Sequence, residues 1–158
     1  MPMLIACCVL EGRTGHEAAY ELLAQLYRQQ TGDPLPEIRR TDRGKPYFAD
    51  EKWHFSISHT KKHAFCALSD KPLGIDAEEK DRKIDLRLAE KILSPMEKAQ
   101  FDSAPDKRLA LLRFWVLKEA AAKLSGEGLR GYPSHTAFSL DDPRVMEMNG
   151  CIVAVLEE

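Results

Sequence analysis

Two carboxylates placed two residues apart give the first indication of chemistry. Asp76 and Glu78 stand in the segment Gly74-Ile75-Asp76-Ala77-Glu78, whose apolar character predicts a strand. Alternation along a strand puts both carboxylates on one face. Mg²⁺ usually takes one or two protein carboxylates and keeps its other positions for water and substrate phosphates. The same pattern also fits a solvated acidic edge, because Glu79 follows immediately.

A second group lies on a predicted helix. Trp115, Glu119 and Lys123 are spaced four residues apart, so they share one helical face, and Glu119 could complete a metal site. The alternative is a Glu–Lys pair that stabilises an exposed helix by a few tenths of a kcal/mol, with Trp115 as ordinary core.

A third group offers donors for a phosphate. Ser58-His59 follows a predicted strand and precedes Thr60, so hydroxyl, imidazole and backbone donors stand close together. A single histidine more often has a structural role. Four basic residues lie just ahead of Pro46, as a local anion site or as a solvated loop: Arg39, Arg40, Arg43 and Lys45.

The elements that must position these residues follow from hydrophobic periodicity and from the residues that begin and end helices. Helices are predicted from Thr14 to about Gln30, from Ser94-Pro-Met-Glu97 onward, and from about Asp106 to Ser125. Strands are predicted at Met3–Leu10, Glu37–Arg40, Trp53–Ser58, Ala64–Ser69, Leu73–Glu78, Thr136–Leu140 and Cys151–Leu156.

The order strand, helix, strands therefore occurs twice along the chain. We predict an α+β fold of two similar small subdomains, residues 1–72 and 73–158, with the acidic residues in the second. A chain of 158 residues is long enough for this arrangement.

Composition limits the class of protein. The net charge of −2 argues against nucleic-acid binding through bulk positive charge. The sequence shows neither a secretory leader nor a membrane-spanning run, so we expect no membrane partner. The cysteines lack C-x-x-C spacing and are expected to be reduced, which suits the cytoplasm: Cys7, Cys8, Cys66 and Cys151.

An ordered set of motifs resembles the 4'-phosphopantetheinyl transferase superfamily. Each motif is weak alone, but the order is specific, above all G-I-D-x-E followed some forty residues later by W-x-x-K-E-x-x-x-K. The set comprises Gly44-Lys-Pro46, Phe55-Ser-Ile-Ser-His-Thr60, Gly74-Ile-Asp-Ala-Glu78, Ile92-Leu-Ser-Pro-Met-Glu97 and Trp115-Val-Leu-Lys-Glu-Ala-Ala-Ala-Lys123 with Gly126 and Gly128. Because a full set of elements precedes Gly74, the chain looks like the Sfp-type group, whose two similar subdomains form a pseudodimer, and we expect a monomer.

The resemblance implies transfer of the 4'-phosphopantetheine arm of coenzyme A to a serine of an apo acyl or peptidyl carrier protein, with release of adenosine 3',5'-bisphosphate. It implies that Asp76, Glu78 and Glu119 hold Mg²⁺, with Mn²⁺ as a substitute, and that Glu119 and Lys123 are catalytic. It further implies contacts to coenzyme A phosphates from Lys45, Ser58, His59, Lys118, Lys123, Arg39 and Arg40.

The chain departs from the family pattern at Ser56, Thr60 and Ala77, and its first half is short. Two other functions stay open: a non-catalytic module that binds coenzyme A or a carrier, and a Mg²⁺-dependent phosphohydrolase. Charge alone suggests basic candidates for carrier recognition, namely Lys61, Lys62 and Arg113.

Overall fold

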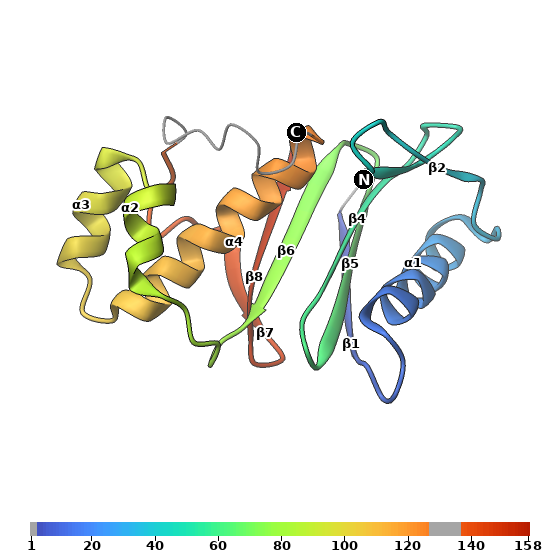
Figure 1. Ribbon diagram of the computed structural model, residues 1–158. Coiled ribbons are helices and arrows are strands. Elements are labelled where there is room, and N and C mark those ends of the chain that lie inside the picture. Colours follow the sequence, from blue (N-terminus) through green and yellow to red (C-terminus); the bar gives the residue numbers. More distant parts are fainter. Residues whose placement is uncertain (1–2, 127–136) are drawn as a thin grey trace.

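Two three-stranded antiparallel sheets organise the computed structural model, which describes residues 3–126 and 137–158 (Figure 1). The first sheet has the order β1 (Leu4–Val9), β5 (His63–Ser69), β4 (His54–His59). Helix α1 (Gly15–Thr31) covers one of its faces, and Leu23 and Phe55 belong to the core between them. A small two-stranded sheet, β2 (Ile38–Arg40) and β3 (Pro46–Phe48), joins α1 to β4.

The second sheet has the order β6 (Leu73–Glu79), β8 (Cys151–Glu157), β7 (Val145–Met148). Helix α4 (Lys107–Ser125) packs on β6 and β8, and Leu117 and Ala154 belong to the core between them. The connection from β6 to α4 carries a 3₁₀ turn (Leu86–Leu88) and two short helices, α2 (Ala89–Ile92) and α3 (Pro95–Ser103).

Both sheets share one topology. In each, a strand leads through helical structure to a hairpin, and the last strand of the hairpin pairs antiparallel with the first strand of the unit. The predicted α+β fold is therefore confirmed, and the repeated order of elements reappears as β1-β5-β4 and β6-β8-β7. The division into subdomains at residue 72 stays a prediction.

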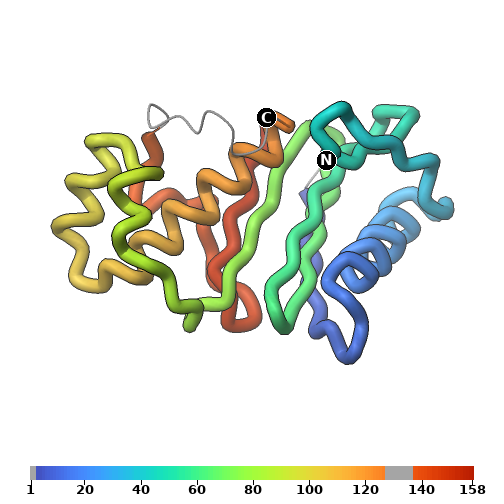
Figure 2. Tube along the Cα trace, in the orientation of Figure 1, coloured from blue at the N-terminus to red at the C-terminus, as the bar shows by residue number. Residues whose placement is uncertain are grey.

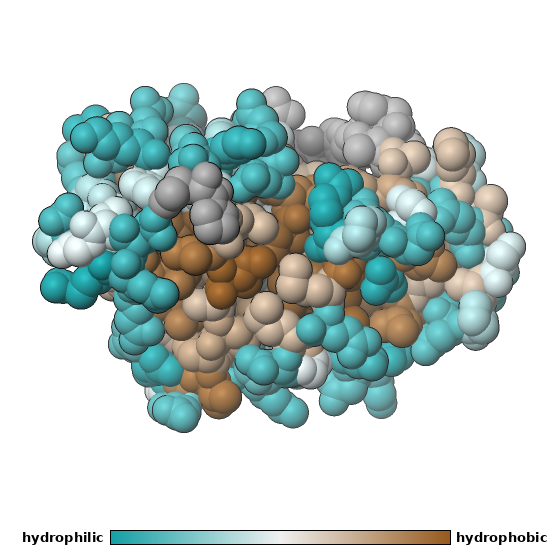
Figure 3. Space-filling model, turned by 180° about the vertical axis from the view of Figure 1, so that it is seen from behind, coloured by the Kyte–Doolittle hydropathy of each residue, from teal (hydrophilic) through white to brown (hydrophobic). Residues whose placement is uncertain are grey.

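A third core joins the two sheets. Strand β6 packs against β4 and β5, and buried side chains of both sheets, such as Phe65, Ile75 and Val153, form one cluster between them. Helices α1 and α4 consequently lie on opposite sides of the two sheets, with α2 and α3 beyond α4 (Figure 2). From behind, apolar residues form a broad area across its middle (Figure 3).

The residues that begin and end the helices act as predicted. The Thr14 hydroxyl accepts a hydrogen bond from the Glu17 amide, and Ser94 forms a reciprocal capping box with Glu97. Gly32 and Gly126 close α1 and α4 in the left-handed conformation, at φ of 80° and 76°.

The strand predicted at Thr136–Leu140 is wrong for the part described, because residues 137–140 carry no strand; Thr136 lies outside the described residues. The strand that pairs with β8 is instead β7. It runs into Asn149-Gly150, both at positive φ, a dipeptide that favours the tight turn of a hairpin. Within the described residues, no helix combines the length and apolar character needed to cross a membrane.

Gly74 sets the distance between β6 and α4. A Cβ there would lie 2.1 Å from the Ala120 carbonyl oxygen and 2.6 Å from the Leu124 amide nitrogen. Both neighbours are helical backbone, which no rotamer change can move aside. Only glycine permits the two elements to approach this closely.

We therefore expect Gly74→Ala to lower the free energy of unfolding by about 3 kcal/mol or more, as measured by urea denaturation. Ile75→Val, on the other face of the same strand, serves as the control and should cost only about 0.5–1.5 kcal/mol. Equal losses in the two variants would show that β6 and α4 separate without penalty.

Candidate active site

The close approach at Gly74 brings Asp76 beside α4. Asp76 follows two residues later on the same face of β6, and its residue is 8% exposed. Its Oδ1 atom accepts a hydrogen bond from the Ser58 hydroxyl at 3.3 Å and lies 3.4 Å from Lys123 Nζ. Its Oδ2 atom is buried and has no hydrogen-bond partner.

The charge on Asp76 is therefore poorly compensated. Burial raises the pKa of Asp76 to about 7, against the opposing effect of Lys123, and the negative charges of Glu119 and Glu78 raise the pKa further. A buried carboxylate oxygen without a donor costs free energy unless a cation or a proton occupies the position. The solvated acidic edge considered for the sequence pattern is thus wrong at Asp76.

Glu78 and Glu119 complete a group of three carboxylates. Glu78 lies on the same face of β6 as Asp76, and its Oε1 atom accepts a 2.6 Å hydrogen bond from Arg82. Glu119 stands on α4, and both line one cleft with Asp76. Burial raises the pKa of Glu119; Lys123 opposes this effect, and Glu78 reinforces it.

Lys123 connects the two halves of the site. Its ammonium group donates to the Ile57 carbonyl at 3.0 Å, on β4, and approaches Asp76 on β6. Lys123 therefore serves the cleft rather than acting as a simple partner of Glu119 on an exposed helix. Trp115 also lines the cleft, as its position one turn before Glu119 suggested.

Basic residues line the side of the cleft that faces the first sheet. Arg40, His59 and Lys123 surround one part, and Lys45 lies in the adjoining part. Burial lowers the pKa of Lys45, whose Nζ atom donates to the Leu124 carbonyl at 3.0 Å. The cleft thus combines carboxylates from β6 and α4 with basic side chains from β2, β4, α4 and the chain before β3.

Most of the predicted residues meet in this cleft. Its two parts share Pro46, Ile57, Glu119 and Lys123, so they adjoin each other between the sheets. The predicted residues that line it are Arg40, Lys45, Ser58, His59, Asp76, Glu78, Glu119 and Lys123.

Two predicted residues lie elsewhere. Arg39 is exposed and pairs with Glu37 at 3.1 Å, because adjacent residues of β2 point to opposite faces and only Arg40 faces the cleft. Lys118 is 1% exposed, and its Nζ atom lies 2.8 Å from Glu97 Oε1. Its ammonium group is inside the protein, and Lys118 does not line the cleft; its contact with coenzyme A stays a prediction.

Sequence reasoning missed three residues of the cleft: His16, Tyr20 and Arg82. His16 and Tyr20 lie one turn apart on α1, and their rings are 4.6 Å apart. The four-residue spacing was visible in the sequence, as was the spacing of Glu78 and Arg82. Neither spacing by itself predicts a site, because only the fold brings α1 and the end of β6 to the same cleft as β4.

His59, on β4, lies close to Gly15 in the first turn of α1. A Cβ at Gly15 would lie 2.2 Å from His59 Cγ, so the missing side chain leaves room for the imidazole beside the first turn of α1. Gly15 and Gly74 have the same role on the two sides of the cleft, since each allows a close approach that places a site residue.

The donor set fits a hard divalent cation. Asp76, Glu78 and Glu119 line one cleft, one of them with a buried oxygen that lacks a partner, and oxygen ligands are what Mg²⁺ prefers. Among the described residues, the ligand atoms of these three carboxylates are not gathered within 4.8 Å of one another, so the side chains would have to close around an ion. The neighbouring cations leave room for an anionic ligand that would share the metal.

Comparison with known proteins gives consistent matches. The family model for the 4'-phosphopantetheinyl transferase superfamily matches residues 72–150. The 4'-phosphopantetheinyl transferase psf-1 of Bacillus pumilus is 38% identical over 130 residues, which cover 80% of this chain and 52% of the relative. The 4'-phosphopantetheinyl transferase Sfp of Bacillus subtilis strain 168 is 37% identical over 90 residues, 54% of this chain and 39% of the relative.

The 4'-phosphopantetheinyl transferase AcpT of Escherichia coli strain K12 is 38% identical over 102 residues, 61% of this chain and 52% of the relative. The chain thus matches about half the length, or less, of these relatives.

The position of Lys118 gives a test of its role. Lys118→Met leaves the Glu97 carboxylate buried without its cation and should cost about 3–5 kcal/mol in the free energy of unfolding. The double variant Glu97→Gln/Lys118→Met should recover part of this loss, because it removes both charges. Folded Lys118→Met should bind coenzyme A as tightly as the wild type does in a calorimetric titration. A weakened affinity at unchanged stability would instead show that Lys118 contributes to coenzyme A binding.

Proposed function

Because this chain belongs to the 4'-phosphopantetheinyl transferase superfamily, we propose that it transfers the 4'-phosphopantetheine moiety of coenzyme A to a serine of an apo carrier protein. The acceptor is an acyl or peptidyl carrier, and the second product is adenosine 3',5'-bisphosphate. The observation that carries the proposal is the buried, unpartnered Oδ2 atom of Asp76, in a cleft that sets carboxylates against cations.

Asp76, Glu78 and Glu119 would hold Mg²⁺, with Mn²⁺ as a substitute. Bound there, the ion would neutralise charge on the pyrophosphate of coenzyme A and so favour departure of its leaving phosphate. The three carboxylates come from two elements, β6 and α4, whose separation is fixed at Gly74.

The basic residues would bind the phosphates. Lys123 is already held between the Ile57 carbonyl and Asp76, which directs its charge toward the carboxylates and thus toward the pyrophosphate. Arg40, Lys45 and His59 would contact the remaining phosphate oxygens through charge-assisted hydrogen bonds. Ser58 would act mainly through Asp76, since its hydroxyl donates to the Oδ1 atom.

Glu119 would accept the proton of the acceptor serine. Burial raises its pKa, so its carboxylate is a stronger base than a solvated glutamate. As that proton leaves, a bond forms between the serine oxygen and the phosphorus of the phosphopantetheine arm. The bond from this phosphorus to the bridging oxygen breaks, and adenosine 3',5'-bisphosphate departs with the electron pair.

The same proposal includes a monomer in the cytoplasm. A single chain supplies both walls of the cleft, from α1 and β4 on one side and from β6 and α4 on the other. The four cysteines are free thiols, which suits a reducing compartment.

We expect an apo acyl carrier protein, or an apo peptidyl carrier domain, to gain one phosphopantetheine mass after incubation with this protein, coenzyme A and Mg²⁺. Asp76→Asn should abolish the gain, and Glu119→Gln should slow it by about 10²–10⁴-fold. Glu147→Gln, which changes an exposed acid paired with Lys80, is the matched control. Intact-mass spectrometry of the carrier, after incubation with the wild type or with each of the three variants, measures the gain.

EDTA should stop the reaction, and excess Mg²⁺ alone should restore it. If coenzyme A binds but neither carrier gains mass, the transferase proposal is wrong and the protein is a binding module. Release of free product in the absence of a carrier would instead identify a phosphohydrolase.

Carrier recognition is a separate part of the proposal. Lys61 and Lys62 are exposed in the turn between β4 and β5. They line a depression of mixed charge, together with Arg82 and Lys83 and with the acidic residues Glu78, Glu79 and Asp81. We expect an acidic carrier to be attracted to the two exposed lysines at this edge. Arg113 is a weaker candidate, because its Nε atom donates to the Leu140 carbonyl at 2.9 Å.

Lys61→Glu/Lys62→Glu should raise the KM for the carrier about tenfold at low ionic strength, with the KM for coenzyme A unchanged. Lys71→Glu, in the turn at the opposite end of β5, is the control and should behave as wild type. Steady-state kinetics at two salt concentrations measure the effect, and equal KM values for the two variants would exclude this edge.

A further inference from the structure

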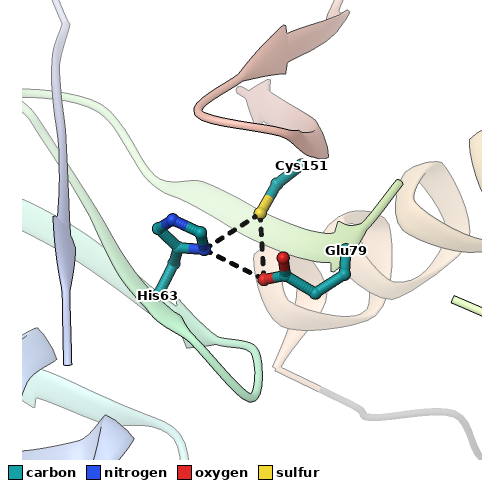
Figure 4. A group of neighbouring side chains, drawn as sticks. All are labelled: His63, Glu79 and Cys151. Atoms are coloured by element: carbon teal, nitrogen blue, oxygen red, sulfur yellow. Dashed lines mark hydrogen bonds and ion pairs between the residues drawn. The ribbon is translucent and has the colours of Figure 1, made fainter. Parts of the chain in front are cut away.

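Three side chains that the proposed reaction does not use converge at one end of the core between the sheets (Figure 4). His63 Nδ1 lies 3.0 Å from Glu79 Oε2 and 3.6 Å from Cys151 Sγ. Cys151 Sγ lies 3.2 Å from the same Glu79 oxygen. Three different ligand types therefore present one atom each to a common point.

Strand register brings these residues together. Glu79 and Cys151 are directly opposite each other in the antiparallel pair of β6 and β8, so their side chains lie on one face. His63 begins β5, which packs against β6. None of the three residues lines the cleft that holds Asp76 and Glu119, so the group is distinct from the proposed active site, although Glu78 and Glu79 both line the depression beside the β4–β5 turn.

The contacts do not form a proton relay. In a nucleophile–base–carboxylate arrangement, the two partners of a histidine use its two different ring nitrogens. Here Cys151 and Glu79 both approach Nδ1. Convergence on one nitrogen is instead the arrangement expected when all three atoms surround a single position.

The distances between the three ligand atoms are close to those of a tetrahedral zinc site. Ligand distances of about 2.0–2.3 Å around Zn²⁺ place tetrahedral N, O and S ligand atoms about 3.4–3.6 Å apart. The three separations in this group are 3.0, 3.2 and 3.6 Å. A shift of only a few tenths of an ångström would therefore admit the ion.

We propose that His63, Glu79 and Cys151 form a zinc site that joins the two sheets. Thiolate and imidazole ligands favour Zn²⁺ over Mg²⁺, which takes oxygen ligands. His63 belongs to the first sheet, whereas Glu79 and Cys151 belong to the second, so the ion would connect β5 to β6 and β8. This role is structural and independent of the transfer reaction.

The group is shielded but accessible. The side chains of His63 and Glu79 are 13% and 15% exposed, and Cys151 is fully buried. Thr60 donates to Glu79 Oε2, and both residues line the depression beside the β4–β5 turn. A water molecule from this side would take the fourth position on the ion.

Without an ion, the group can persist as a set of hydrogen bonds around the Glu79 carboxylate. Zinc would replace the thiol proton of Cys151, as ligand thiols bind metal in the thiolate form. Metal binding should therefore release protons, which distinguishes a zinc site from hydrogen bonds alone.

The test is titration of the full chain with Zn²⁺ in excess Mg²⁺, which keeps the acidic cleft filled. We expect one equivalent to bind, with proton release measured by calorimetry in buffers of different ionisation enthalpy. Co²⁺ in place of Zn²⁺ should give a thiolate-to-cobalt charge-transfer band. Zinc should also raise the midpoint of thermal unfolding.

Cys151→Ser and Glu79→Gln should weaken zinc binding by at least about tenfold, and Cys151→Ser should abolish the charge-transfer band. Cys8→Ser is the matched control, because Cys8 lies on the helix-facing side of β1 and should leave the band unchanged. The cobalt spectrum of the wild type requires no variant, so a variant that fails to fold leaves the test intact. Absence of zinc binding by the wild type, or a band that survives in folded Cys151→Ser, would overturn the proposal.

Discussion

The contact between β6 and α4 at Gly74 is the constraint on which the candidate active site depends. A strand and a helix normally keep their backbones apart by the side chains between them. At Gly74 no side chain intervenes, and the strand meets the helix at Ala120 and Leu124. Asp76 is two residues further along β6, and Glu119 and Lys123 immediately precede those helical contacts. One missing side chain therefore sets the spacing of a carboxylate group drawn from distant parts of the sequence.

The repeated topology explains why the two sheets bring different kinds of polar side chain to one cleft. Each sheet has a helix on its outer side, so the two inner faces meet and form a common core. Where β4 and β6 adjoin, the first sheet supplies Ser58 and His59 and the second supplies Asp76 and Glu78. Ser56 ties the strands together by accepting a hydrogen bond from the Ile75 amide at 3.0 Å. A cleft between two such units therefore contains side chains suited to a metal ion and side chains suited to a phosphate, without a contribution from any other part of the fold.

Local periodicity predicted much of this site. Alternation put Asp76 and Glu78 on one face, and helical spacing put Glu119 beside Lys123, as the structure has them. The same periodicity explains why Arg39 and Lys118 do not line the cleft. Lys118 is adjacent to Glu119 in sequence but lies on another face of the helix, and its charge is compensated by Glu97, from α3. That partner could not be predicted, because no spacing along a single element links α3 to α4. Nor could any pattern within one strand reveal His63, Glu79 and Cys151, which come from three strands.

Glu78 and Glu79 show how much chemistry the two faces of one strand can carry. They are neighbours in sequence: Glu78 lines the cleft, Glu79 contacts His63 and Cys151, and both line the depression beside the β4–β5 turn. Glu79 is held by Thr60, His63 and Cys151, so its backbone position is fixed from three directions. These contacts tie the end of β6 to β5 and β8 whether or not zinc occupies the group, and an ion there would add one more link at that end of the strand.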